Sequence, residues 1–518
     1  MLKKIWKKKE PNYWSLSIWG YCLLISLIFL QIASKSSPLY PFNDWVDVNA
    51  SFTMGKAMMN GRILYRDIFD QRGPLFYLLF GLAYLISSSS FLGVFILEVF
   101  SFSVFLYFCF KLFSLFLDNK YSLIALSLIA LFILNLISFE QGGSSEEFCL
   151  PLIAISLYCL LNYFKNVYPK PMPYQGIFIN GIIAGSVLWM KYSLLGFWVG
   201  WIVSILLCVF INLGFLHVVK NSLVFSLGII TTTIPWIIYF GVNLSIVEFI
   251  NSYFLINMIY YPQANSINSI VRFTMIGIIS PFLLNPVFVT HLYSGLIIFI
   301  IHKKYLNNTL KKIGLFLCFF LLILSVHGSG RGYLYRYYFL IISPFVIFGF
   351  IVLFTIIYER FGKIKSFNLF SMIIVSIVVV GFLYTLRFNQ NTSMMKVDEE
   401  DLVQYNFATI INQTEDATLL NYGRLDGGFY TTTGITPNVK FFQNQNIPHS
   451  KFPLVMDEQN RYIKEQVVDY VIIQIQPSQI DDFSSIPYLE ENYKLIKEEH
   501  QQYENEKFYY LLFKKTED

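Results

Sequence analysis

A short charged run beside an apolar segment holds the side chains best suited to chemistry. The stretch GRILYRDIFDQRGP places five charged residues within eleven positions: Arg62, Arg66, Asp67, Asp70 and Arg72. Carboxylates serve as general bases or metal ligands, and a guanidinium binds a phosphate through two parallel hydrogen bonds. The run therefore contains the groups that would accept a proton and hold an anion.

Acidic side chains are scarce in the apolar part of the chain, and they are clustered. Only 12 of the 33 acidic residues precede residue 390. Seven of the 12 fall in two short segments: Asp44, Asp47, Asp67, Asp70, Glu140, Glu146 and Glu147. Any one of them could be an ordinary solvated loop residue, but the gathered set favours general-base work or metal binding.

A second group of cations lies in the tyrosine-rich stretch HGSGRGYLYRYYFLIISP, which contains Arg331 and Arg336. Arginine and tyrosine at a membrane interface can act as simple anchors. Alternatively, the two guanidinium groups form a phosphate clamp.

The composition identifies the class of protein that must position these side chains. Of the 518 residues, 55% are hydrophobic and 14% are charged, against about a quarter charged in soluble proteins. Many apolar runs reach the ~20 residues that cross a bilayer. We expect an α-helical polytopic membrane protein. Its net charge of +5 reflects basic cytoplasmic loops and does not indicate nucleic-acid binding.

The positive-inside bias predicts about eleven transmembrane helices and a cytoplasmic N-terminus. The expected spans are 14–33, 91–113, 121–138, 148–164, 177–190, 194–213, 221–241, 270–301, 313–327, 338–357 and 367–386. The span 270–301 contains Pro281 and Pro286, which could break it. The apolar segment from Pro74 to Ser87 is too short for a crossing, so we expect an interfacial helix.

The composition and the pattern of the sequence change after the last span. Residues 390–518 hold 21 of the 33 acidic residues, and they alternate helical and strand-like patterns. We therefore predict two domains: a transmembrane domain at 1–389, with a first external loop at 34–90, and a small extracytoplasmic α/β domain at 390–518.

Other chemistry has little support. The chain has no nucleotide-binding or zinc-protease motif, and its six cysteines lie in or beside apolar runs. No cofactor is indicated, although the carboxylates could hold a divalent metal ion. A proton-coupled transporter would need charges inside the membrane, where Glu98 stands alone.

Two motifs in the external loops resemble a known family. The first loop reads M-x-x-G-x-x-x-Y-R-D-x-F-D-x-x-G-P-L-x-Y, and the second reads GGSSEEF. Together they resemble bacterial membrane glycosyltransferases of the GT-C superfamily, in particular protein O-mannosyltransferase-like and lipid A aminoarabinose transferase-like members. The resemblance implies transfer of a sugar from a polyprenyl-phosphate carrier to an acceptor hydroxyl, usually with inversion.

The resemblance also implies roles for particular residues. Asp47 matches the family's first-loop base best, with Asp44 as runner-up. The acidic-basic-proline turn of the family falls on Asp70 and Arg72, where relatives more often have His-Lys in place of Gln71 and Arg72. The second-loop acid corresponds to Glu146 or Glu147, of which Glu146 is preferred.

The predicted enzyme transfers a sugar from a polyprenyl-phosphate donor to a cell-surface polymer or lipid at the outer face of the cell membrane. Its partners would be the donor, an envelope glycan or lipid acceptor, and membrane lipid. The donor phosphate would be bound by Arg72, Arg331, Arg336 and, more weakly, Arg66. The alternatives are an envelope polysaccharide polymerase or ligase, which would need large arginine-rich loops, and a lipid-linked sugar transporter or flippase.

Overall fold

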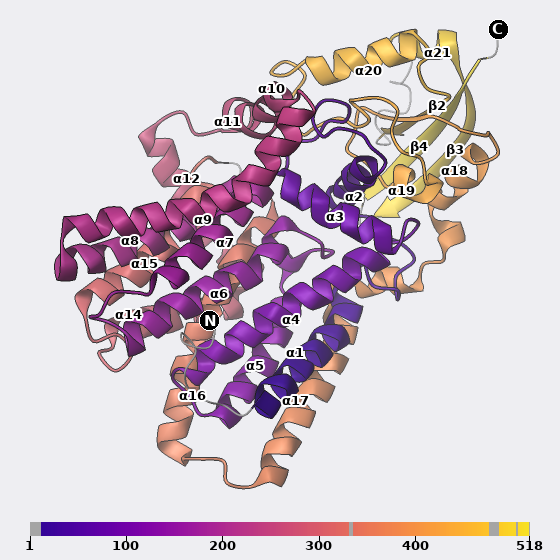
Figure 1. Cartoon of the computed structure of the whole chain (residues 1–518). Helices are drawn as coiled ribbons and strands as arrows, with labels where there is room; N and C mark the ends of the chain where they lie inside the picture. Colours follow the sequence, from indigo (N-terminus) through magenta and orange to yellow (C-terminus); the bar gives the residue numbers. More distant parts are fainter. Residues whose placement is uncertain (1–11, 331–334, 476–485, 504–505, 517–518) are drawn as a thin grey trace. The chain divides into compact units, whose positions relative to one another are not determined.

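The computed structural model of the chain describes residues 12–330, 335–475, 486–503 and 506–516 (Figure 1). It forms two compact units. The helical unit comprises Met1–Ser34, Leu97–Trp236 and Gln263–Thr392, and the mixed unit comprises Lys35–Ile96, Ile237–Pro262 and Ser393–Asp518. The mixed unit therefore combines the first loop with residues that follow the last span.

Ten helices in the described part of the chain are long and apolar enough to cross a membrane. They come from α1 (Asn12–Ala33), α4 (Leu92–Ser114), α6 (Ser145–Asn166), α7 (Tyr174–Lys191), α8 (Gly196–Leu213), α9 (Phe215–Val242), α12 with α13 (Ile267–Ile279 and Pro281–Leu284), α15 (Thr309–His327), α16 with its leading 3₁₀ turns (Val346–Phe361 and Arg336–Phe345) and α17 (Phe367–Phe388). The predicted class, a multi-pass helical membrane protein with a small sheet domain, is confirmed.

The predicted spans differ from the structure in two places. Helix α5 (Asn119–Leu134) has 16 residues and ends before residue 138. The span expected at 270–301 is interrupted at Asn285, and α14 (Pro286–Ile301) begins immediately after it. Proline can begin a helix but cannot continue one, so Pro281 and Pro286 each occupy a first helical position.

Helices of the helical unit approach closely where both carry glycine. A Cβ added at Gly295 of α14 would lie 2.1 Å from the Cα of Gly349 in α16, and one at Gly228 of α9 would lie 2.7 Å from the Cα of Gly181 in α7. Small residues permit such backbone contact, which drives helix association in lipid, where burial of apolar surface contributes little.

Polar contacts within the helical unit join segments that are distant in the sequence. Lys120 donates to the carbonyl oxygen of Ile364 at 2.8 Å, and both positions belong to loops assigned to the same side. Arg336 pairs with Glu140 at 3.1 Å, and both of these belong to loops assigned to the opposite side. Segments that the charge pattern places together therefore do meet.

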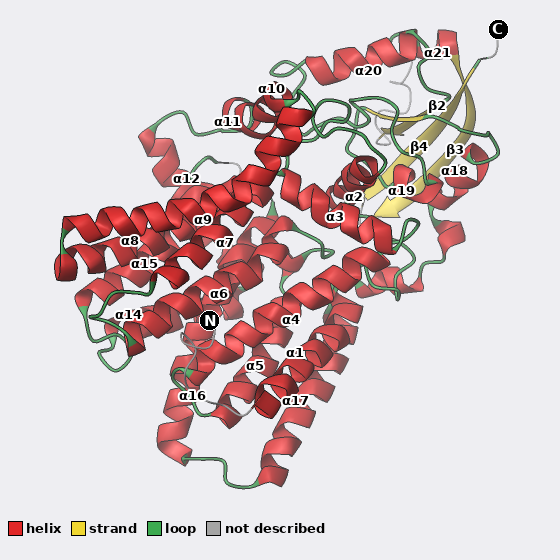
Figure 2. Cartoon of the chain, viewed as in Figure 1, coloured by secondary structure: helices red, strands yellow, loops and turns green. Residues whose placement is uncertain are grey.

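The mixed unit contains a four-stranded sheet in the order β1-β2-β4-β3 (Figure 2). Strand β1 (Leu419–Tyr422) runs parallel to β2 (Tyr470–Ile475), which pairs antiparallel with β4 (Glu506–Lys515), and β4 pairs antiparallel with β3 (Tyr493–Tyr503). Its helices are α18 (Val403–Ile411), α19 (Phe429–Thr433), α20 (Leu454–Lys464) and α21 (Leu489–Asn492). The short helices α10 (Ile246–Phe249) and α11 (Ile256–Ile259) also belong to this unit.

Helix α2 (Val46–Met59) lies at the centre of the mixed unit. It packs on α3 (Pro74–Ile86) and on α19, and its residues from Val48 to Ala57 are all buried. At the crossing with α3, a Cβ on Gly55 would lie 2.4 Å from the backbone nitrogen of Gly81. The two helices therefore meet backbone to backbone.

We expect Gly55→Ala to lower the thermal midpoint of the detergent-solubilised protein, because overpacking a close contact typically costs about 1–3 kcal/mol. The matched control is Gly20→Ala in α1, where an added Cβ meets nothing within 4 Å. Both changes gain the same helix propensity, so only Gly55→Ala should destabilise. Equal midpoints for the two variants would contradict the close packing of α2 on α3.

Candidate functional site

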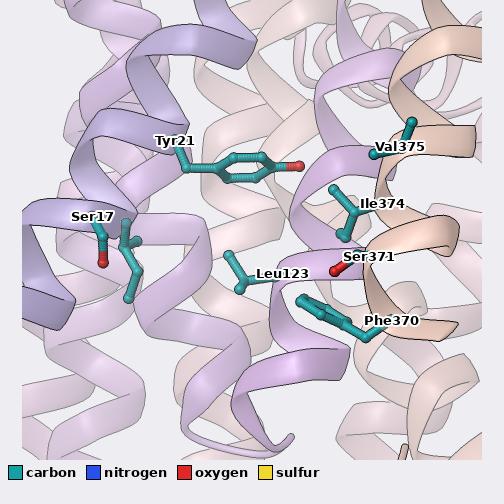
Figure 3. Close-up of a pocket in the computed structure, with 8 residues that line it drawn as sticks. Ser17, Tyr21, Leu123, Phe370, Ser371, Ile374 and Val375 are labelled. Atoms are coloured by element: carbon teal, nitrogen blue, oxygen red, sulfur yellow. The ribbon is translucent and has the colours of Figure 1, made fainter. Parts of the chain in front are cut away.

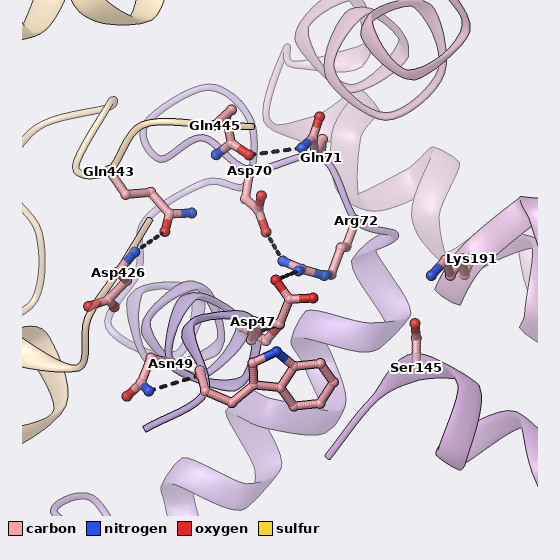
Figure 4. Close-up of polar contacts among 12 residues, drawn as sticks. Asp47, Asn49, Asp70, Gln71, Arg72, Ser145, Lys191, Asp426, Gln443 and Gln445 are labelled. Carbon is pink, nitrogen blue, oxygen red and sulfur yellow. Dashed lines mark hydrogen bonds and ion pairs between the residues drawn. The ribbon is translucent and has the colours of Figure 1, made fainter. Parts of the chain in front are cut away.

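Three charged side chains from the first loop converge in the mixed unit (Figure 4). The guanidinium of Arg72 binds Asp47 Oδ1 through its Nη2 at 2.6 Å and Asp70 Oδ2 through its Nη1 at 2.8 Å. Asp47 lies in the first turn of α2, whereas the other two belong to the turn before α3. The structure therefore brings together three of the predicted site residues.

Two buried tyrosines hold this turn in place. The hydroxyl of Tyr77 donates to Asp70 Oδ2 at 2.8 Å and accepts the backbone N–H of Arg72 at 2.8 Å. The hydroxyl of Tyr65 donates to the carbonyl oxygen of Arg72 at 2.6 Å. With Pro74 beginning α3 directly afterwards, the backbone that carries Arg72 is fixed on both sides.

Asp47 and Asp70 differ in the solvent exposure of their side chains, and this difference indicates different roles. The side chain of Asp70 is 1% exposed, whereas those of Asp47 and Arg72 are 17% and 22% exposed. A group that takes a proton from a substrate must come within hydrogen-bond reach of it. Asp47 and Arg72 can therefore meet a ligand, and Asp70 can orient the guanidinium from behind.

The helical unit contains a second charged cluster. Lys191, at the end of α7, pairs with Glu146 Oε1, and Glu146 Oε2 accepts a hydrogen bond from Ser145 Oγ at 2.8 Å. The ammonium group lies 3.8 Å from the ring centroid of Tyr338. The predicted residue Glu146 is fully buried, so it is placed to hold Lys191 and not to contact a ligand itself.

A third pair joins two further loops of the helical unit. Arg336 Nε binds Glu140 Oε1 at 3.1 Å, and the Arg336 side chain remains 51% exposed. His327 lies buried in the same tyrosine-rich stretch, with its ring stacked on Phe339 at 4.8 Å. Arg336 can therefore still reach an anion, whereas His327 is a packing residue.

The remaining predicted residues have other partners or cannot be placed. Asp44 pairs with Lys35 at 2.7 Å, and Arg66 pairs with its neighbour Asp67 at 2.8 Å. Arg331 lies outside the described residues. Neither Asp44 nor Arg66 joins the Arg72 cluster through an ion pair recorded among the described residues.

Two carboxylates that the sequence did not link to each other form a pair. Glu98 of α4 is buried and interacts with the carboxyl group of Glu147, the alternative to Glu146. Ser34 Oγ donates to Glu98 Oε2 at 2.8 Å, and the backbone N–H of Gly143 donates to Glu147 Oε2 at 2.8 Å. This pair braces the loop that precedes α6.

Sequence reasoning missed Lys191 and Gln445. Lys191 falls between the expected spans 177–190 and 194–213, and a lone cation with almost no loop around it could have indicated a buried partner. Gln445 accepts a hydrogen bond from Gln71 Nε2 at 2.9 Å. The sequence has no signal for this contact, because the two residues are 374 positions apart.

A cavity of about 330 Å³ opens among α1, α5 and α17 (Figure 3). Tyr21, Leu123 and Phe370 line it, and its lining includes no charged side chain among the described residues. It is an apolar space between spans and not a site for transfer chemistry. In the part of the chain that the structure describes, no three His, Cys, Asp or Glu side chains group as metal ligands, so the metal ion stays a prediction.

A buried lysine joins α2 to the C-terminal part of the mixed unit. Lys56 donates to the carbonyl oxygen of Tyr430 at 2.7 Å, and Thr53 on the same helix donates to Asp426 Oδ2 at 2.7 Å. Burial lowers the pKa of Lys56 to about 7, opposed by the charge of Asp426. Burial likewise raises the pKa of Asp426 above its ordinary value.

Known proteins resemble this chain in fold and not in sequence. No family profile matches it, and no curated protein matches it in sequence. The crystal structure of ArnT from Cupriavidus metallidurans bound to undecaprenyl phosphate matches with a TM-score of 0.61 at 10% identity, covering 95% of this chain and 98% of that one. The apo structure of ArnT gives 0.60 at 9% identity with the same coverage. This chain has the ArnT fold.

The likeness to ArnT covers nearly the whole length of both chains, so the predicted GT-C resemblance is confirmed at the level of the fold. Fold alone does not assign chemistry, which depends on the particular side chains of a site. In this chain the candidate side chains are Asp47, Asp70 and Arg72.

We expect Lys191→Met to destabilise the helical unit, because it leaves the buried carboxylate of Glu146 without its cation. Breaking a buried pair in this way typically costs about 3–5 kcal/mol. The double variant Lys191→Met with Glu146→Gln should recover much of that loss, as measured by thermal unfolding in detergent. Additive losses in the double variant would contradict the pairing.

We expect the free energy of unfolding to rise with pH between about 7 and 10.5 through Lys56. In that window the unfolded chain holds a proton at residue 56 that the folded chain has released, so raising the pH favours folding. Below about pH 7 the folded chain bears the full free-energy cost of a buried, charged Lys56, and above about pH 10.5 this cost is absent.

Lys56→Met should remove this part of the pH dependence, so the wild type gains stability relative to the variant as the pH rises. Unfolding midpoints of both proteins in one detergent, followed from about pH 7 to about pH 10, provide the measurement. Parallel curves would show that Lys56 stays charged in the folded protein.

Proposed function

We propose that this chain is a glycosyltransferase that moves a sugar from a polyprenyl-phosphate donor to a hydroxyl of an envelope glycan or lipid. The observation that carries the proposal is the ion-paired set of Asp47, Arg72 and Asp70. It supplies a reachable base and a reachable cation in a chain with the fold of ArnT, a protein solved with undecaprenyl phosphate bound.

The proposed reaction needs two charged groups. A base takes the proton of the acceptor hydroxyl while its oxygen attacks the anomeric carbon, and the bond from that carbon to the phosphate oxygen breaks. The lipid phosphate leaves with the bonding electrons, so a cation must stabilise the growing negative charge. Asp47 is the proposed base, and Arg72 is the proposed phosphate ligand.

The ion pair between these residues gives the donor a way to activate the base. In the structure Arg72 is bound to Asp47 at 2.6 Å. A phosphate that takes over the guanidinium would compete with Asp47 for the same N–H donors. Asp47 would then lose its counter-ion and become a stronger base when the donor is in place, while Asp70 keeps Arg72 oriented.

The other charged residues have supporting roles in this proposal. Within the helical unit, Glu146 holds Lys191 and Glu140 pairs with Arg336, whose guanidinium stays exposed, so these two cations are further candidates for binding phosphate. Arg66 and Arg331 are weaker candidates for phosphate binding, and Asp44 is the weaker candidate for the base. The proposed orientation places the N-terminus in the cytoplasm and the residues after α17 outside, in keeping with the positive-inside bias.

We expect Asp47→Asn to reduce transfer by at least about a hundredfold, the usual contribution of a positioned base. Asp44→Asn is the matched control, because Asp44 lies three residues away and pairs with Lys35 instead. The measurement is transfer of labelled sugar from a panel of polyprenyl-phosphate sugars by purified protein in lipid vesicles.

The membrane abundance and thermal midpoint of both variants should match those of the wild type. A loss in Asp44→Asn with full activity in Asp47→Asn would reverse the assignment of the base. Movement of the lipid-linked sugar across the vesicle membrane without transfer would show a flippase and overturn the proposed function.

A further inference from the structure

A polar hollow lies within the mixed unit, apart from the ion-paired residues. Its volume is about 530 Å³, within the range of roughly 300–1,000 Å³ that small-molecule sites occupy. Two loops of the C-terminal part of the chain form most of its rim, and the sheet contributes Gln474 of β2 and Phe508 of β4. Val46, the first residue of α2, completes the wall.

The lining is rich in amides. The amide, charged and aromatic residues of the lining are Arg424, Asn444, Gln445, Asn446, Gln474 and Phe508. An amide both donates and accepts hydrogen bonds, as does a sugar hydroxyl. No carboxylate of the described residues lines the hollow, which argues against a cation as its ligand.

The rim is held in shape by its own backbone. The N–H of Asn444 donates to the carbonyl oxygen of Arg424 at 2.8 Å, and its side-chain amide donates to the carbonyl oxygen of Gly423 at 3.2 Å. The two loops are therefore tied together before any ligand arrives, which reduces the ordering cost of binding.

One amide of the lining is buried without full use of its hydrogen-bonding groups. Gln445 is 5% exposed, and its Oε1 accepts a hydrogen bond from Gln71. Its Nε2 has no partner within the described part of the chain. Buried polar atoms normally have partners, so an unpaired donor on a residue that lines a hollow suits a ligand oxygen.

The hollow is continuous in sequence and in hydrogen bonding with the proposed reaction centre. Val46 in its wall is followed directly by Asp47, and Gln445 binds Gln71, which is followed directly by Arg72 (Figure 4). The hollow and the proposed reaction centre are therefore linked through Val46 and through the contact between Gln445 and Gln71.

We infer that this hollow binds a carbohydrate segment of the acceptor, so that the enzyme receives its hydroxyl from a glycan and not from a simple lipid headgroup. The inference rests on the proposed function and specifies its acceptor class. The amides recognise hydroxyl groups, the ring of Phe508 provides an apolar face for a pyranose, and the exposed guanidinium of Arg424 accepts a neutral or acidic sugar.

The test measures binding and not transfer. Wild-type protein in lipid nanodiscs is titrated with defined tri- and tetrasaccharides, neutral and uronic-acid-containing, and with a glycerol-phosphate oligomer, using saturation-transfer nuclear magnetic resonance. We expect at least one saccharide to bind. Gln474→Ala and Arg424→Ala should each weaken that binding about tenfold, the usual effect of one deleted hydrogen-bonding group.

The matched control is Gln413→Ala, the same substitution at an exposed position that does not line the hollow. Arg424 is also exposed, so its removal tests the hollow even if Gln474→Ala disturbs the sheet. Absence of saccharide binding, binding of the glycerol-phosphate oligomer alone, or equal binding by all variants would overturn the inference.

Asp47→Asn separates this inference from the proposed function. The variant should bind the saccharide as tightly as the wild type while transferring no sugar. If the wild type binds saccharide but transfers nothing, the proposed function fails and the glycan site stands. If it transfers sugar to an acceptor but the hollow variants bind and transfer normally, the glycan site fails alone.

Discussion

The mixed unit depends on the burial of helix α2. Ten consecutive residues, Val48 to Ala57, are shielded from solvent, so the helix has contacts on every side and no free face. One side meets α3 at Gly55, and another meets the C-terminal part through Thr53 and Lys56. Because Asp47 is in the first turn of this helix, the position of the proposed base follows from packing far more than from its own contacts.

Removing the charged groups of the site from water costs free energy, which other contacts must offset. Holding Arg72 between Asp47 and Asp70 removes three charged groups partly from water, and such desolvation can cost as much as the attraction returns. Two tyrosine hydroxyls, from Tyr65 and Tyr77, supply the hydrogen bonds that keep the turn in place. The arrangement is therefore better suited to ligand exchange than to stability.

Local patterns predicted much of this structure, and long-range packing explains the rest. Apolar runs indicated the spans, and the family motif indicated Asp47 and Arg72 together. The alternating patterns after residue 390 indicated an α/β domain but did not specify strand β3 (Tyr493–Tyr503), because this edge strand carries charged residues that hide its β pattern. The partners Lys191 and Gln445 depend on contacts between distant segments, for which a single sequence has no local signal.

The distance along the chain between α2 and its partners has a consequence for biogenesis. Lys56 and the carbonyl it binds, that of Tyr430, are 374 positions apart, with most of the spans between them. The first loop therefore leaves the ribosome long before the residues that bury it. Until the residues around Tyr430 have been synthesised, Lys56 lacks the acceptor that it has in the folded chain. A chain truncated before Tyr430 therefore cannot bury α2 as the complete chain does.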